Sequence, residues 1–111
     1  GAVIYKFNSG DFLLAKRQAN PFLRLISSNR YTEAFHYVDP SRITIEDLEA
    51  IGKVAGHYFS GATYFHESYK NVYIAGFKPI LDDNDQFNDK RLEFVICKVN
   101  GEWKVTYISY D

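Results

Sequence analysis

Two of the three histidines are, by residue type, the side chains best suited to chemistry in this chain. His57 falls near the end of a predicted helix and His66 on the strand predicted after it, so the two imidazoles could approach each other. Such a pair can exchange protons near neutral pH or ligate a metal ion. Neither histidine belongs to a His-Glu-x-x-His motif or a comparable ligand spacing. We therefore expect two partly exposed surface histidines, and we assign no catalytic residue and no metal site.

The acidic segment 82–89 has the composition of a calcium-binding loop. In the best frame, oxygen-bearing side chains occupy ligand positions at Asp82, Asn84, Gln86 and Glu93. However, Phe87 stands where the sharp turn of such a loop needs glycine, and Lys90 takes another ligand position. The sequence therefore predicts a solvated turn here and no cofactor.

The overall composition excludes several classes of partner. The net charge is −1 and the basic residues are scattered, so nucleic acid has no general attraction to this chain. No apolar run approaches the ~18 residues that a membrane span needs. Cys97 is the only cysteine, which excludes an internal disulfide and predicts a packed thiol in a strand.

The length of 111 residues predicts a single domain over 1–111, with an N-terminal arm over 1–10. The chain has no methionine and begins at Gly1, which looks like a tag or processing scar. We therefore expect that upstream residues have been removed and that the protein is secreted or periplasmic.

The first half of the chain predicts three helices. Apolar residues recur at steps of three and four from Phe12 to Ile26 after a cap at Ser9, and Pro21 either kinks this helix or divides it. A short helix is predicted over 30–38. A third helix begins at the cap residue Thr44 with a capping-box pattern. It is expected to reach Phe59 and to end at a left-handed Gly61, and its small residues, Gly52, Ala55 and Gly56, predict close packing.

The second half changes to the alternating pattern of strands. Segments 62–69 and 71–80 predict two strands joined by a tight turn, and Gly76 predicts a bulge or bend in the second. A polar loop leads to a closing hairpin over 92–110. Helices followed by four such strands predict an α+β fold, an antiparallel sheet with helices on one face.

The closing hairpin turns at Asn100-Gly101, which fits a two-residue type I′ turn. That turn fixes the register and places Phe94 opposite Tyr107.

The face predicted to lie against the helices carries Leu92, Phe94, Ile96, Trp103, Val105 and Tyr107. The other face has an apolar centre, namely Val95, Cys97, Val99 and Ile108. Because Glu93, Glu102 and Lys104 surround this centre, it resembles an interface, and we expect a homodimer through it.

Several of these features together resemble the NTF2-like superfamily, the cystatin-like α+β cone. They are the segment from Asn29 to Phe35 leading into Val38-Asp39-Pro40, the capped helix from Thr44, and the closing hairpin with its Asn-Gly-Glu-Trp turn. The resemblance implies a strongly curved sheet that wraps the helices and leaves a cone whose mouth can hold a small apolar ligand. Members include isomerases, dehydratases and transport adaptors, so the fold alone does not assign a function.

The residues expected to bind such a ligand are His57, Tyr64, His66 and Tyr107, with either face of 62–69 lining the cone. The favoured function is a non-catalytic module for ligand binding or protein assembly. The alternative is a small isomerase- or dehydratase-like enzyme, in which His66, His57 or Asp39 would be the base and Tyr64 or Tyr107 the hydrogen-bond donor.

Overall fold

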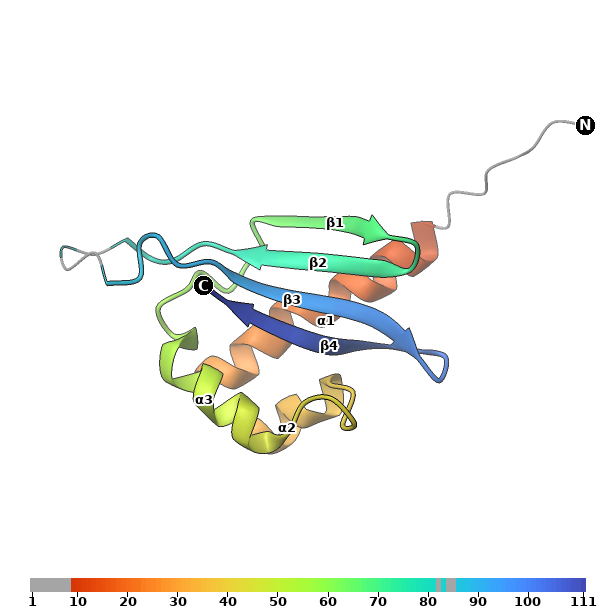
Figure 1. Ribbon diagram of the computed structural model, residues 1–111, viewed down its shortest axis with the longest axis horizontal. Helices are drawn as coiled ribbons and strands as arrows, with labels where there is room; N and C mark the ends of the chain where they lie inside the picture. The colour runs from red at the N-terminus through yellow and green to blue at the C-terminus, as the bar shows by residue number, and fades with distance from the viewer. Residues whose placement is uncertain (1–8, 82, 84–85) are drawn as a thin grey trace, which may run out of the picture.

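The computed structural model describes residues 9–81, 83 and 86–111, and it has the α+β architecture that the sequence predicts (Figure 1). Three helices and a short 3-10 turn precede a four-stranded antiparallel sheet with the strand order β1-β2-β3-β4. The elements are α1 (Ser9–Ser27), α2 (Tyr31–Ala34), η1 (Phe35–Tyr37), α3 (Ile45–Ala55), β1 (Tyr64–Tyr69), β2 (Val72–Phe77), β3 (Leu92–Val99) and β4 (Glu102–Tyr110). The predicted arm lies mostly in 1–8, outside the described residues.

The first helix, α1, is continuous through Pro21, so the single-helix alternative is correct. It ends in a Schellman motif. Asn29 adopts φ 60°, the Asn29 N–H donates to the Ile26 carbonyl and the Arg30 N–H donates to the Leu25 carbonyl. This abrupt end lets the chain turn at once into α2.

The third helix, α3, begins as predicted and ends earlier than predicted. Thr44 and Asp47 form the capping box at its start. The helix stops at Ala55, and the predicted left-handed stop at Gly61 is wrong. The reason is that the backbone beyond α3 pairs with the segment that follows β2: Tyr58 forms a bridge with Pro79, and the Phe59 N–H donates to the Lys78 carbonyl over 3.0 Å.

The small residues of α3 have different environments. A side chain at Gly52 would overlap the Tyr31 ring, so close packing is confirmed there. Gly56 has open space around it, and the packing predicted for it is wrong.

The core lies between α1 and the inner face of the sheet. The largest fully buried side chains from α1 are Phe22, Leu23 and Ile26, and those from β3 are Leu92, Phe94 and Ile96. The Phe22 and Phe94 rings meet edge to face, with centroids 4.9 Å apart. Figure 1 shows α1 passing behind the sheet, so the face toward the viewer has no helix on it.

The closing hairpin follows its predicted register only as far as Val105. Asn100 and Gly101 both have positive φ, as a type I′ turn requires, and Val105 lies opposite Ile96. A β-bulge then inserts Thr106, after which Tyr107 lies opposite Val95 and Ile108 opposite Phe94.

This single extra residue reverses the faces of everything after it, because side chains alternate with a period of two. Tyr107, predicted inside, is 62% exposed on the outer face. Ile108, predicted on the outer face as part of the dimer interface, packs against the core instead. The other five residues predicted on the inner face of the hairpin are buried as expected: Leu92, Phe94, Ile96, Trp103 and Val105.

Candidate functional site

The outer face of the sheet gathers most of the predicted site residues. Strand register places Tyr64, Glu93 and Ser109 in one row across the sheet, and His66, Ile74, Val95 and Tyr107 in the next. A third row carries Val72 and Cys97, and Val99 follows toward the turn. The apolar members of these rows are half-buried by their own neighbours. The described helices all pack elsewhere, so this face is available for contact.

The Tyr64 side chain extends from β1 across β2 to β3 at one end of this face. Its ring lies over Gly76, where any side chain would overlap it, and its hydroxyl donates to the Glu93 carboxylate on β3. Burial raises the pKa of Tyr64 to about 12, and the hydrogen bond to Glu93 adds to the rise. Gly76 is therefore required for this crossing, and the bulge predicted at Gly76 is wrong, since the irregularities lie at 67–69 and at Thr106.

His66 and His57 have different neighbours. The His66 ring stacks on Tyr64 with centroids 5.8 Å apart, so it belongs to the outer face. His57 stacks on Phe87 at 4.1 Å, and its carbonyl accepts from the Ile80 N–H. His57 is thus held against the 79–91 connection, apart from the rows that contain His66. Within the described ranges, no three His, Cys, Asp or Glu side chains lie close enough together to hold a metal ion.

The acidic loop can be described only in part. Asp82, Asn84 and Asp85 lie outside the described residues. Glu93, the twelfth position of the calcium frame, is a β3 residue bonded to Tyr64.

The bulge at Thr106 lies next to the contact between β4 and the loop before α3, where the Asp39 N–H donates to the Val105 carbonyl. The Thr106 hydroxyl donates to the Val95 carbonyl at 3.3 Å and lies 3.4 Å from the Cys97 sulfur. Asp39, 7% exposed, accepts from the Ser41 N–H at 3.0 Å and from the Ser41 hydroxyl at 2.7 Å. These Ser41 bonds hold the pKa of Asp39 below its ordinary value, and Arg42 contributes less.

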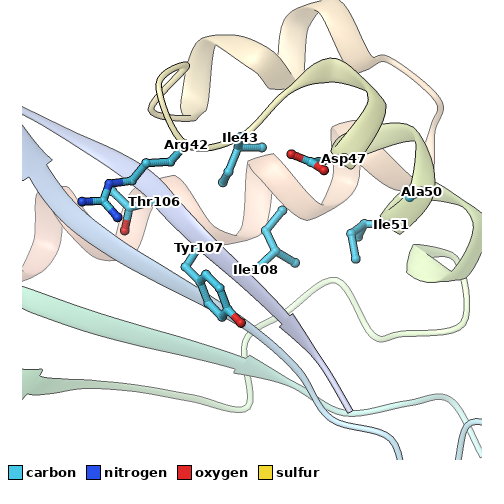
Figure 2. A pocket seen from close by; sticks show the side chains of 8 residues that line it. All are labelled: Arg42, Ile43, Asp47, Ala50, Ile51, Thr106, Tyr107 and Ile108. Carbon is cyan, nitrogen blue, oxygen red and sulfur yellow. The ribbon is translucent and has the colours of Figure 1, made fainter.

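Two hollows meet beside the bulge, and sequence reasoning missed both. One, about 280 Å³, lies between α3 and β4 and is shown in Figure 2; it is lined by Arg42, Ile43, Asp47, Ala50, Ile51, Thr106, Tyr107 and Ile108. The other, about 510 Å³, lies over the outer face beside Val95, Cys97 and Val99. Arg42, Thr106 and Tyr107 border both. The sequence carries no signal for them, because the bulge and the 39–43 loop create them jointly.

The inner face offers little for the expected cone. Tyr107 does not line it, and Tyr64 and His66 point away from it, while Phe65 and Glu67 point inward from β1. Side chains of α1 and the sheet fill the space between them. Burial, then the negative charge of Glu67 and the hydrogen bond with it, raise the pKa of Tyr73. This tyrosine–carboxylate pair on neighbouring strands resembles the acid–base pair of the enzyme alternative, although neither residue is one of those predicted for it.

No helix in the described part of the chain is both long and apolar enough to cross a membrane. Nor does any protein-family model, curated protein or solved structure match this chain at a significant level. The residues and their geometry therefore carry the functional argument.

Proposed function

We propose that this chain is a non-catalytic assembly domain of the NTF2-like type, and that it pairs with a second copy of itself through the outer face of its sheet. The observation that carries this proposal is an apolar sheet face without a helix on it. Its centre consists of Val72, Ile74, Val95, Cys97 and Val99, and the tyrosines Tyr64 and Tyr107 flank it. A face of this kind favours burial against another surface, because aromatic side chains with a polar tip suit interfaces.

The rim of the face supports a two-fold contact. At one end, the Lys104 ammonium nitrogen lies 3.3 Å from a carboxylate oxygen of Glu102, and Glu93 lies at the other end. Charged residues at the rim and apolar residues at the centre are typical of interfaces that bury about 800 Å² on each partner. Since Ile108 packs into the core, the proposed interface is Val95, Cys97 and Val99 from the original set, joined by Val72 and Ile74 of β2.

The enzyme alternative has less support. Its predicted donors Tyr64 and Tyr107 and the base His66 lie on the outer face, whereas acid–base catalysis on an apolar substrate uses a water-excluded pocket. The other two candidate bases are engaged elsewhere, since His57 stacks on Phe87 and Asp39 accepts hydrogen bonds from Ser41. The NTF2-like assignment itself rests on the order of helices and strands and on the closing hairpin.

Analytical ultracentrifugation tests the dimer directly. The parent protein at tens of micromolar should sediment as a dimer, and Val95→Asp should sediment as a folded monomer, because it would bury an unpaired charge in the interface without touching the core. Ser60→Asp is the matched control, since it adds the same charge at an exposed position after α3. A monomeric parent would refute the proposal, as would a Val95→Asp variant that remains dimeric.

A further inference from the structure

One half of the β4 edge is already covered and the other half is not. Val38 forms a parallel bridge with Val105, and the Asp39 N–H donates to the Val105 carbonyl over 2.9 Å. Beyond Thr106, no strand in the described part of the chain pairs with the free edge of β4. The covered half shows that this edge accepts an extended backbone.

The hydrogen-bonding groups of the uncovered half point away from the sheet. Arg91 and Asp111 exchange both of their backbone hydrogen bonds, at 2.6 and 3.0 Å. In an antiparallel pair such residues alternate with residues whose N–H and C=O groups face outward. The backbone groups of Ile108 and Tyr110 therefore face outward. They are arranged as a template for another strand.

A groove runs beside this template. Figure 2 shows Ile43, Ile51 and Ile108 around one central space, with Ala50 on the α3 side. The hollow of about 280 Å³ has room for an apolar side chain projecting from a strand bound at the edge. The β1 edge differs in this respect, because α3 and the loop before it lie on the β4 side of the sheet (Figure 1).

The charge at the groove indicates what the bound strand should carry. Asp47 is engaged with the backbone of Thr44 in the capping box. Arg42 has a side chain that is 68% exposed, and its guanidinium lies 3.7 Å from Asp39, a carboxylate already bonded to Ser41. Arg42 can therefore pair with a ligand carboxylate while Asp39 keeps its hydrogen bonds with Ser41.

We propose that the groove between α3 and the free half of β4 binds an extended peptide segment of a partner protein, which joins the sheet as a fifth strand. The segment places an apolar side chain among Ile43, Ile51 and Ile108 and an acidic side chain beside Arg42. The affinity comes from the backbone bonds to Ile108 and Tyr110, and the pocket and Arg42 provide specificity, as in other cases of strand addition. This site adjoins the proposed dimer face at Arg42, Thr106 and Tyr107, but its isoleucine pocket and the backbone groups of Ile108 and Tyr110 lie outside the apolar centre of that face.

The test uses the intact protein and a blocked nonapeptide in which threonine and valine alternate around a central leucine, with glutamate two positions after it. Binding should be saturable at about 10–100 µM. Amide hydrogen exchange at Ile108 and Tyr110 should slow about tenfold or more, because the peptide bonds to their backbone groups. A peptide N-methylated at alternate residues should not bind, and lysine in place of glutamate should weaken binding about fivefold or more.

Two variants of α3 locate the site. Ala50→Arg places a long side chain in the groove and should weaken binding about tenfold or more. Glu49→Gln is the matched control, because it changes the net charge by the same amount at a neighbouring exposed residue outside the groove lining. The Val95→Asp variant should bind the peptide as the parent does, which separates this proposal from the dimer.

Three results would overturn the inference. They are the absence of saturable binding up to about 1 mM, protection of the β1 edge or the outer face in place of Ile108 and Tyr110, and an affinity that Ala50→Arg leaves unchanged.

Discussion

The two faces of the sheet come from the same alternating strands and have different environments. On the inner face, Phe94 and Ile96 are fully buried against α1. On the outer face of the same strand, Val95 and Cys97 are only half-buried, and Tyr107 beside them is largely exposed. The hydrophobic core of one chain lies on the inner face alone. The dimer proposed above would bury the apolar residues of the outer face as well.

The largest expected effect comes from comparing neighbouring residues of β3. Phe94→Ala should lower the free energy of unfolding by about 3–5 kcal/mol, because its ring packs against Phe22 and Phe77 at 4.9 and 5.0 Å. Val95→Ala should cost less than about 1 kcal/mol when measured below the dimer dissociation constant. Urea unfolding of the two variants at low protein concentration gives both values. Equal losses would mean that the two faces are equally important for folding.

The same strands show which parts of the fold can be predicted from sequence. The type I′ turn at Asn100-Gly101 requires positive φ at both residues, so the sequence predicts the turn and the register near it. The bulge at Thr106 has no such signal. Val105, Thr106, Tyr107 and Ile108 fit a strand with or without an inserted residue, since apolar residues occur in both alternations. The error therefore begins at Thr106 and reaches two predicted site residues.

Deleting Thr106 tests what the bulge contributes. The shortened strand would pair regularly, with Tyr107 still opposite Val95 and Ile108 still opposite Phe94, so we expect the deletion to cost only about 0.5–1.5 kcal/mol for the lost hydrogen bond from the Thr106 hydroxyl. Thr106→Val, which keeps the chain length, should cost about 0.5–1.5 kcal/mol for the lost hydrogen bond to Val95. Thermal or urea unfolding compares the two. A deletion much more costly than Thr106→Val would show that the bulge itself, and not only the Thr106 hydroxyl, stabilises the sheet.

The candidate site was predictable where it follows strand alternation and unpredictable where it depends on contacts between distant segments. Val95, Cys97 and Val99 lie on the outer face as expected, because they are close to the turn that fixes their register. The sequence marks Gly76 as unusual for a strand, but the reason for the glycine is the Tyr64 ring that lies over it from β1. The groove beside Arg42 depends on how α3 and its preceding loop pack beside β4, which no local pattern records.

The smallest expected effect concerns the bond between Tyr64 and Glu93 at the end of the outer face. Tyr64→Phe removes a partly exposed hydrogen bond, so at pH 8 it should cost about 0.5–1 kcal/mol after screening by solvent. The folded pKa of Tyr64, about 12, lies above its ordinary value of 10.0. The stabilisation is therefore complete below pH 10 and is lost as the pH rises through 12, since the unfolded chain releases its proton first. Urea unfolding should show the difference in the free energy of unfolding between parent and variant shrinking from pH 8 to pH 11.5.

Tyr69→Phe, on the same strand but 77% exposed, is the control and should leave the free energy of unfolding unchanged at pH 8. If the difference in the free energy of unfolding stays constant across this pH range, the Tyr64 hydroxyl is not partly buried against Glu93 as described.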